Sequence, residues 1–477
     1  MKYITYTLLF ICFLMASCSK WLDVKPEDRT TEDQLLSTPQ GFADVANGFY
    51  IRNGSNELYG RNLTMTTMDI LAQLYLVSSQ NKEYAIANFN YADGNARDFI
   101  SNTWGALYTQ IANVNKFIQS LDQYGNRISE TLKGRYLGEA YGLRAFYYLD
   151  LVRMFTPKYT SPDSVNKVIP YYDKITPDIR SYTATNDIMQ QILNDLKTAE
   201  ELLLKNDAAV SQSRVSAETT GPDNSRTKRN YFMNYYAVRA LKARAYLWMG
   251  KTADALEEAK FLISVQPKFR WILPADLSTP STCNKIFSTE LIFAVENPIL
   301  NDVFNAKFSP TLFDADILAP NISGTFINNT VFEGSPLDYR SQYSWKVAGR
   351  PFPTFFKYQD LPSSGLAANR TVPLIRMGEM YLIAAECEPD LPSAIGYLNE
   401  LKGHRNTNPL SPSSTTAQLT QAILKEYRKE FYGEGQLFFF YKRTGATSII
   451  AAKNNGSMAI NAANYTFPVP FSETDPR

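Results

Sequence analysis

A short stretch near the start of the chain carries the residue types that accept a lipid. Met15, Ala16, Ser17 and Cys18 form a sequence that resembles the bacterial lipobox, where cleavage precedes the cysteine and its sulfur takes a diacylglycerol. The apolar run before them, residues 3–15, is shorter than the about 20 residues that span a bilayer and is typical of a secretory signal. We therefore expect residues 1–17 to be a lipoprotein signal peptide and Cys18 to be the lipid attachment site. The alternative is an ordinary export signal that a cysteine happens to follow.

Catalytic chemistry has few candidates, because the chain holds a single histidine, His404. One imidazole makes histidine zinc sites, and nucleophiles that need an imidazole base, hard to build. A glycosidase needs only two carboxylates about 5 to 10 Å apart, and 47 acidic residues always allow a pair to be proposed. No pair is marked by its setting, so we expect no catalytic site, no metal site and no cofactor. His404 is interpreted as a polar residue at a helix end.

Composition limits the partners and the redox chemistry. The chain has 48 basic and 47 acidic side chains and a net charge of +1, so nothing predicts a nucleic-acid surface. Once residues 1–17 are removed and Cys18 carries lipid, Cys283 and Cys387 remain. They could form one disulfide in an exported protein, but sequence cannot show their proximity, and we favour two free buried thiols.

Hydrophobic periodicity predicts several helices that alternate with irregular stretches. Apolar residues recur at spacings of three and four over 99–121, 136–155, 187–204, 374–387, 392–401 and 417–431. Asn186 or Asp187 is a plausible cap for the third of these helices. Residues 205–230 are polar and predict an exposed loop, with a solvated basic cluster of Arg226, Lys228 and Arg229.

One segment has the spacing of a tetratricopeptide repeat, a helix-turn-helix in which small residues let two helices cross closely. It comprises Ala243, Tyr246, Leu247, Gly250, Ala255, Leu256, Ala259 and Pro267. The other helical pairs show fragments of this pattern, which predicts degenerate repeats, since a lone unit could not bury its own face. Between residues 269 and 366 the periodicity gives way to short apolar pieces and many prolines, which predicts an irregular subdomain with short strands and ordered loops.

These patterns together resemble the SusD/RagB family of outer-membrane nutrient-binding lipoproteins of Bacteroidetes. In the N-terminal half the resemblance is carried by Cys18 with Trp21, Leu22, Asp23 and Pro26, by Trp104 to Asn115, by Gly138 to Leu149, and by the tetratricopeptide segment. In the C-terminal half it is carried by Leu374 to Glu386, by Glu426, Arg428, Glu430, Phe431, Glu434, Gly435 and Arg443, and by Pro468 to Pro470.

The resemblance implies a mostly α fold, in which four degenerate tetratricopeptide-like units support the irregular subdomain. It implies a single domain over 18–477, with an N-terminal helical part to about 268, the irregular part over 269–372 and C-terminal helices with a closing strand over 373–477. It further implies a lipid-anchored protein at the outer membrane, facing the cell exterior, that delivers a captured oligosaccharide or peptide to a SusC-like TonB-dependent transporter. In such proteins the charged motifs are structural, so we interpret Arg376 with Glu379, and Arg428 with Glu430, as charge pairs within packed helices. Family members sometimes carry a structural calcium, but no loop of EF-hand spacing is present.

Aromatic residues are the candidate ligand platforms, because they make up 13% of the chain and a flat apolar ring with a polar tip suits sugars as well as cores. The family's ligand contacts come from variable loops, so our candidates follow from position alone. They are Tyr84, Asn88, Phe89 and Tyr91 in a polar connector, and Trp271, Tyr339, Tyr343 and Trp345 in the irregular subdomain. Asn81, Asn88 and Asp93 could bond ligand hydroxyls beside them, while packing stays the alternative for every ring.

The sequence thus favours a non-catalytic surface lipoprotein that binds an oligosaccharide or peptide. Two alternatives stay open. A surface glycoside hydrolase would cleave its ligand, and a tetratricopeptide scaffold for protein partners would have no small-molecule pocket.

Overall fold

The computed structural model describes residues 31–160, 162–215, 228–320, 324–362 and 367–475. Residues 1–17, Cys18 and the Trp21 to Pro26 motif lie outside the described residues. Within the described ranges, no helix is both long enough and apolar enough to cross a membrane.

Helices dominate the structure, as the resemblance predicts. The long ones and those near the irregular part are α3 (Pro39–Asn53), α6 (Gly94–Tyr124), α7 (Glu130–Phe155), α8 (Thr185–Asn206), α9 (Tyr235–Trp248), α10 (Thr252–Ser264), α12 (Leu300–Lys307), α13 (Tyr339–Ser344), α14 (Met377–Cys387), α15 (Leu391–Gly403), α16 (Thr416–Glu430) and α17 (Gln436–Thr444). The shorter ones include α2 (Glu32–Leu35), α4 (Thr67–Leu71), α5 (Tyr84–Ala87), α11 (Pro274–Ser278) and α18 (Phe471–Thr474). The mostly α fold is therefore confirmed.

Strands are short and occur in antiparallel pairs. They are β1 (Lys167–Pro170) with β2 (Tyr182–Ala184), β3 (Leu291–Glu296) with β6 (Thr371–Arg376), β4 (Trp345–Val347) with β5 (Pro353–Phe355), and β7 (Ser448–Ala451) with β8 (Gly456–Ala459). Because each sheet has only two strands, it depends on the helices around it for burial.

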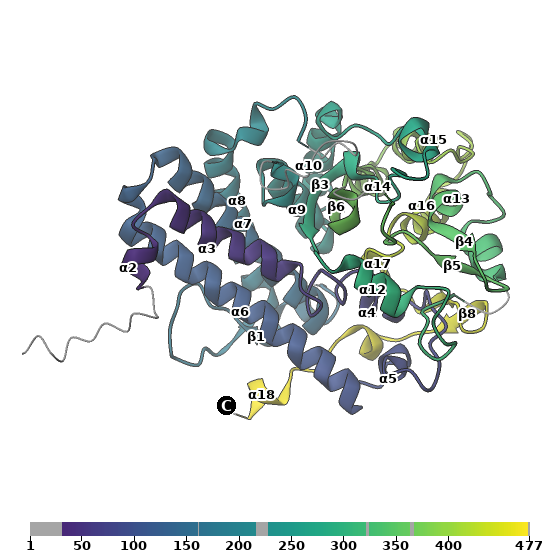
Figure 1. Cartoon of the computed structure of the whole chain (residues 1–477), viewed down its shortest axis with the longest axis horizontal. Coiled ribbons are helices and arrows are strands. Elements are labelled where there is room, and N and C mark those ends of the chain that lie inside the picture. Colours follow the sequence, from purple (N-terminus) through teal and green to yellow (C-terminus); the bar gives the residue numbers. More distant parts are fainter. Residues whose placement is uncertain (1–30, 161, 216–227, 321–323, 363–366, 476–477) are drawn as a thin grey trace, which may run out of the picture.

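The helices form one continuous array in which neighbours along the chain are neighbours in space. Helix α6 packs on α7, α7 on α8, α8 on α9 and α9 on α10, and the array then continues through α14 and α15. Figure 1 shows the long helices α3, α6, α7 and α8 at one end of the molecule and the irregular part at the other. Each helix buries one stripe of apolar side chains. In α6 this stripe contains Trp104, Leu107 and Ile111.

Several helix starts differ from the sequence predictions, and α7 begins at Glu130, six residues before Tyr136. Helix α6 begins five residues before Phe99, because the Asp93 side chain accepts a hydrogen bond from the Asn95 N–H at 2.9 Å and caps the helix. Helix α8 begins at Thr185 with Ala184 in the cap position, so the predicted cap at Asn186 or Asp187 is wrong. Ala184 ends β2, whose pairing with β1 fixes this boundary.

The irregular part is inserted between two paired strands, β3 and β6. Helix α10 packs directly on α14, although more than one hundred residues separate them. Strands β3 and β6 pair antiparallel, with Ala294 opposite Pro373 and Glu296 opposite Thr371, and the Asn297 N–H extends the pairing to the Arg370 carbonyl at 2.6 Å. Residues 298–369 therefore leave and re-enter the helical array at one place. The prediction that Leu374 to Arg376 begins a helix is wrong, since these residues complete β6.

A buried charge network joins the β3–β6 strand pair to the C-terminal helices. Arg376 donates to Glu430 Oε1 at 2.6 Å and to both Glu434 oxygens at 3.0 to 3.1 Å. Arg405 donates to Glu290 and Glu430, with Nη2 2.6 Å from an oxygen of each. The structural role predicted for these residues holds, but the predicted pairs are wrong. Glu379 pairs with Arg244 at 2.6 Å, and Glu430 pairs with Arg340, Arg376 and Arg405.

The predicted solvated basic cluster is wrong for Arg229, and Arg226 lies outside the described residues. Arg229 is buried and pairs with Glu139 at 2.8 Å and with Asp207 at 2.7 Å. Its 3₁₀ turn, η6 (Arg229–Tyr231), packs on β3, so the loop returns to the core before α9. Cys283 and Cys387 are both free and buried, as we favoured, and burial raises the pKa of the Cys387 thiol to about 12.

Candidate functional site

One loop-rich surface is built from segments that are far apart in the sequence. The chain before α5 contacts the irregular part through a bridge between Leu76 and Ala319, where the Leu76 N–H donates to the Ala319 carbonyl at 2.7 Å. Asn81 Nδ2 donates to the Ala315 carbonyl at 3.0 Å, and Glu83 forms an ion pair with Lys307 at the end of α12. These contacts fix the loop over residues 309–319 beside α5.

The β7–β8 hairpin forms the third side of this surface (Figure 1, lower right). Asn455 Nδ2 donates to Thr325 Oγ1 at 3.0 Å, and Thr330 Oγ1 donates to Asn455 Oδ1 at 3.1 Å. Lys453 Nζ donates to Asn88 Oδ1 at 3.3 Å. The hairpin tip therefore touches both the segment after α5 and the π-helix η9 (Phe326–Val331), an element type that is frequent at functional sites.

Exposed rings and side-chain amides gather on these segments. Phe313 is 82% exposed and Tyr84 is 39% exposed, which is high for aromatic side chains. We call the surface the amide face and define it by Tyr84, Asn88, Phe313, Asn328, Asn329, Asn454 and Asn455, whose asparagines are all exposed. A primary amide both donates and accepts hydrogen bonds. The side chains of Asn88, Asn454 and Asn455 already hydrogen-bond within the protein. Among the described residues none hydrogen-bonds the side-chain amides of Asn328 and Asn329, so these two can bond ligand hydroxyls of either polarity.

Backbone conformation holds α5 in place beside this surface. Gln73 has a φ of 62°, and its Nε2 donates to the Ala87 carbonyl at 2.8 Å and to the Ile70 carbonyl at 3.2 Å. Phe89, directly after α5, has a φ of 56°, a left-handed conformation that non-glycine residues seldom adopt. Such positions persist only where the surroundings enforce them, so Tyr84 and Asn88 are presented on a fixed backbone.

Two acidic groups near the amide face are already paired. Glu83 pairs with Lys307 and Asp314 with Arg350. Across the described residues there is no group of three or more histidine, cysteine, aspartate or glutamate side chains placed to hold a metal ion. The amide face therefore offers hydrogen bonding and stacking as its chemistry.

The structure brings Tyr84 and Asn88 to the amide face but directs their predicted neighbours elsewhere. Asn81 and Asp93 use their side chains to hold the 315–316 backbone and to cap α6, so neither is placed to bond a ligand. Tyr91 donates to the Asn464 carbonyl at 2.5 Å and packs on Phe467. It lines a separate groove of about 650 Å³. Phe89 is half-buried against Tyr91.

The four candidates of the irregular subdomain belong to the core or its edge. Trp271 is 6% exposed and stacks on His404 with 4.5 Å between ring centroids, which also gives His404 a packing role. Trp345 is 7% exposed and packs on Tyr432 and Phe355. Tyr339 and Tyr343 are partly buried against the small cluster that contains Cys283. Burial therefore favours the packing alternative for these four rings.

Sequence reasoning missed Phe313 and most of the asparagines of the amide face. Their local signals are weak: Asn328-Asn329 and Asn454-Asn455-Gly456 indicate turns as readily as recognition. What defines the surface is contact between distant segments, since Lys453 and Asn88 are 365 residues apart in the chain.

Comparison with protein families agrees with this architecture. Residues 20–220 match a model described as "Starch-binding associating with outer membrane", and residues 205–474, more than half of the chain, match the model of the SusD family. The chain therefore belongs to the SusD family, as the resemblance predicts.

Individual relatives are distant but extend over nearly the whole chain. SusD-like protein P2 of Formosa agariphila is 23% identical over 99% of this chain and 97% of its own. Among solved structures, a SusD superfamily protein from Bacteroides thetaiotaomicron has a TM-score of 0.73 at 22% identity, covering 92% of this chain and 98% of that chain. A SusD-like carbohydrate binding protein from Bacteroides vulgatus has a TM-score of 0.70 at 18% identity, covering 92% and 96%. At these identities the structural matches show the shared fold.

Proposed function

We propose that this protein captures an oligosaccharide at the amide face without cleaving it. The observation that carries the proposal is the exposed ring of Phe313, held in a loop beside α5 and exposed side-chain amides. Aromatic rings stack on the apolar faces of sugars, while a few placed polar groups fix the orientation. An extended peptide is the second ligand class that amides and rings can bind.

The family suggests how the captured ligand is used. Cys18 would carry the lipid that anchors the chain, after removal of residues 1–17, so that the body lies on the outside of the outer membrane. The ligand would then pass to a SusC-like TonB-dependent transporter. Modest affinity suits this task, because a tightly held ligand leaves slowly.

The test is binding of residues 19–477 to an array of polysaccharides and peptides, scored for capture and for released products. We expect capture of a polysaccharide without cleavage. In the variants Phe313→Ala and Tyr84→Ala we expect binding to weaken about tenfold, which is about 1.4 kcal/mol. The matched control is Phe471→Ala, which removes a ring that is 63% exposed on α18, away from the amide face, and should leave capture unchanged.

Other outcomes would support the alternatives. Release of shorter sugars would favour a glycoside hydrolase. Capture that is as strong in both ring variants as in the control would place the ligand elsewhere on the molecule. If no polysaccharide or peptide on the array binds and protein partners are recovered instead, the result would favour a tetratricopeptide scaffold.

A further inference from the structure

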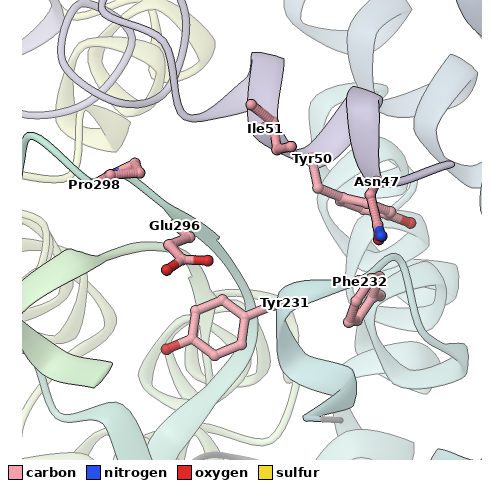
Figure 2. A pocket seen from close by; sticks show the side chains of 7 residues that line it. All are labelled: Asn47, Tyr50, Ile51, Tyr231, Phe232, Glu296 and Pro298. Atoms are coloured by element: carbon pink, nitrogen blue, oxygen red, sulfur yellow. The ribbon is translucent and has the colours of Figure 1, made fainter. Parts of the chain in front are cut away.

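A second hollow lies between the end of α3, the η6 turn and the end of β3 (Figure 2). Its volume is about 190 Å³, and it is lined by Asn47, Tyr50, Ile51, Tyr231, Phe232, Glu296 and Pro298. We call it the α3 pocket. It shares no residue with the amide face.

Buried hydrogen bonds fix the aromatic walls of the α3 pocket. Tyr50 donates its hydroxyl to Glu139 Oε2 at 2.8 Å and accepts from the Met233 N–H at 3.2 Å. The Tyr231 hydroxyl is 2.5 Å from Thr371 Oγ1. Phe232 packs edge to face on Tyr50 at 4.9 Å between centroids. Since both hydroxyls are engaged with the protein, and Figure 2 shows them pointing away from each other, the rings present apolar surface to the pocket.

Two polar groups of the lining retain hydrogen-bonding capacity. Among the described residues, none forms a hydrogen bond with the half-buried side-chain amide of Asn47. Glu296 Oε1 lies 3.1 Å from Arg370 Nε, and both side chains are well exposed, at 37% and 38%. The carboxylate therefore keeps lone pairs for other donors, while the guanidinium offsets its charge. A neutral ligand with hydroxyl groups suits this site better than a cation does.

We propose that the α3 pocket binds one neutral pyranose ring. Fixed aromatic walls match the apolar face of a sugar, and an amide and a carboxylate on opposite sides of the hollow match hydroxyls on opposite edges of one ring. The volume is below the roughly 300 to 1,000 Å³ of pockets for drug-sized ligands, which favours one ring over a longer segment. This inference rests on the proposed function, because the ring would belong to the captured glycan and a second contact would raise avidity for a polymer.

The test is saturation-transfer difference NMR of residues 19–477 with the methyl glycosides of glucose, galactose, mannose and xylose at millimolar concentration. We expect at least one glycoside to receive saturation. Glu296→Gln preserves size but turns a hydrogen bond to a charged group into a neutral one, and Asn47→Leu removes the amide, so each should weaken its binding about tenfold. Phe471→Ala, which lies outside both the amide face and the α3 pocket, is the matched control and should leave this signal unchanged.

The results separate this inference from the proposed function. A glycoside signal that survives in both pocket variants, or no signal from any of the four glycosides, overturns the α3 pocket as a sugar site. If no polysaccharide on the array binds, while the wild-type glycoside signal is lost in both pocket variants, the α3 pocket is supported as a sugar site and capture at the amide face is contradicted. If Phe313→Ala abolishes polymer capture and the pocket variants change nothing, the reverse holds.

Discussion

Glu430 is the carboxylate on which three guanidinium groups converge. Its Oε1 lies 2.6 Å from Arg376 and from Arg405, and its Oε2 lies 2.8 Å from Arg340. Burial alone would raise the pKa of Glu430, but the charges of Arg405, Arg376 and Arg340 outweigh burial and hold the pKa well below its ordinary value. A carboxylate with a depressed folded-state pKa adds stability above its unfolded pKa, and this stability is lost as the pH falls.

We expect Glu430→Gln to lower the free energy of unfolding by about 3–5 kcal/mol at neutral pH, because it removes the carboxylate shared by three buried guanidinium groups, which keep their other partners, among them Glu434, Glu290 and Asp338. Wild-type stability should fall as the pH drops below the ordinary value of 4.5, and the variant should lose less over the same range. Urea unfolding at pH 7 and at acidic pH measures both effects. Glu257→Gln, at an exposed position of α10, is the control and should stay within about 0.5 kcal/mol. Equal stability of the two variants would contradict the role of the network.

At the scale of elements, the end of α3 is set by how closely it approaches β3. A Cβ atom on Gly54 would lie 2.0 Å from the Glu296 carbonyl oxygen, which is a steric overlap with backbone. We expect Gly54→Ala to destabilise the fold by about 1–3 kcal/mol. It should also weaken the binding of any ligand in the α3 pocket, because Ile51 and Glu296 both line this pocket.

Gly48→Ala is the matched control for this prediction. It lies in the same helix, and no atom is within 4 Å of its added Cβ, so higher helix propensity should stabilise it by roughly 0.5–1 kcal/mol. Thermal unfolding of both variants measures the difference. If Gly54→Ala melts at or above the wild-type temperature, α3 can shift freely and the close approach does not set its position.

How well each element could be predicted depends on how local its cause is. The stripe of α6 is visible in the sequence because Trp104, Leu107 and Ile111 repeat at helical spacing. Leu374 to Arg376 were misassigned because they continue the apolar pattern of α14, while their strand conformation comes from pairing with β3, more than eighty residues away. Arg229 was misassigned because a basic residue in a polar stretch carries no sign of the buried carboxylates it meets.

The candidate site was predictable only in part for the same reason. Tyr84 and Asn88 could be chosen because an aromatic and amide-rich connector is visible in one segment. Phe313 and Asn455 become neighbours of that segment only through the Asn81, Thr325 and Lys453 contacts. Trp271 has the same residue type as a ligand platform, and only its stack on His404 reveals a packing role.

At the scale of the whole molecule, the irregular part and the helical array share one core. Arg340 in α13 reaches Glu430 in α16, and Trp345 in β4 packs on Tyr432 after α16 with 4.9 Å between centroids. Lys357 donates to Glu434 Oε1 at 2.5 Å. Since these contacts are buried, opening one part exposes uncompensated charge in the other, so both parts should unfold together.

The two free thiols provide a direct test of this cooperativity. In residues 19–477 the cysteines are Cys283, beside the irregular part, and Cys387, in α14. Pulse labelling with a thiol reagent across a urea series should give the same midpoint for both, as a single cooperative transition requires. Labelling of Cys283 at clearly lower urea would show that the irregular part opens independently. The fluorescence of the tryptophans serves as a control for global unfolding.

Pairing of β3 with β6 lets the segment between these strands change in length and sequence. Residues 298–369 begin and end at adjacent strand positions, Glu296 and Thr371, so their termini stay together whatever lies between them. The entropy of closing a loop grows only with the logarithm of its length, by about 0.6 kcal/mol per doubling. Insertions and deletions that spare the anchoring residues Arg340, Trp345 and Lys357 can therefore rebuild the Phe313 side of the amide face with little loss of stability. The loops of this surface can change in length and sequence while α10 and α14 keep their packing.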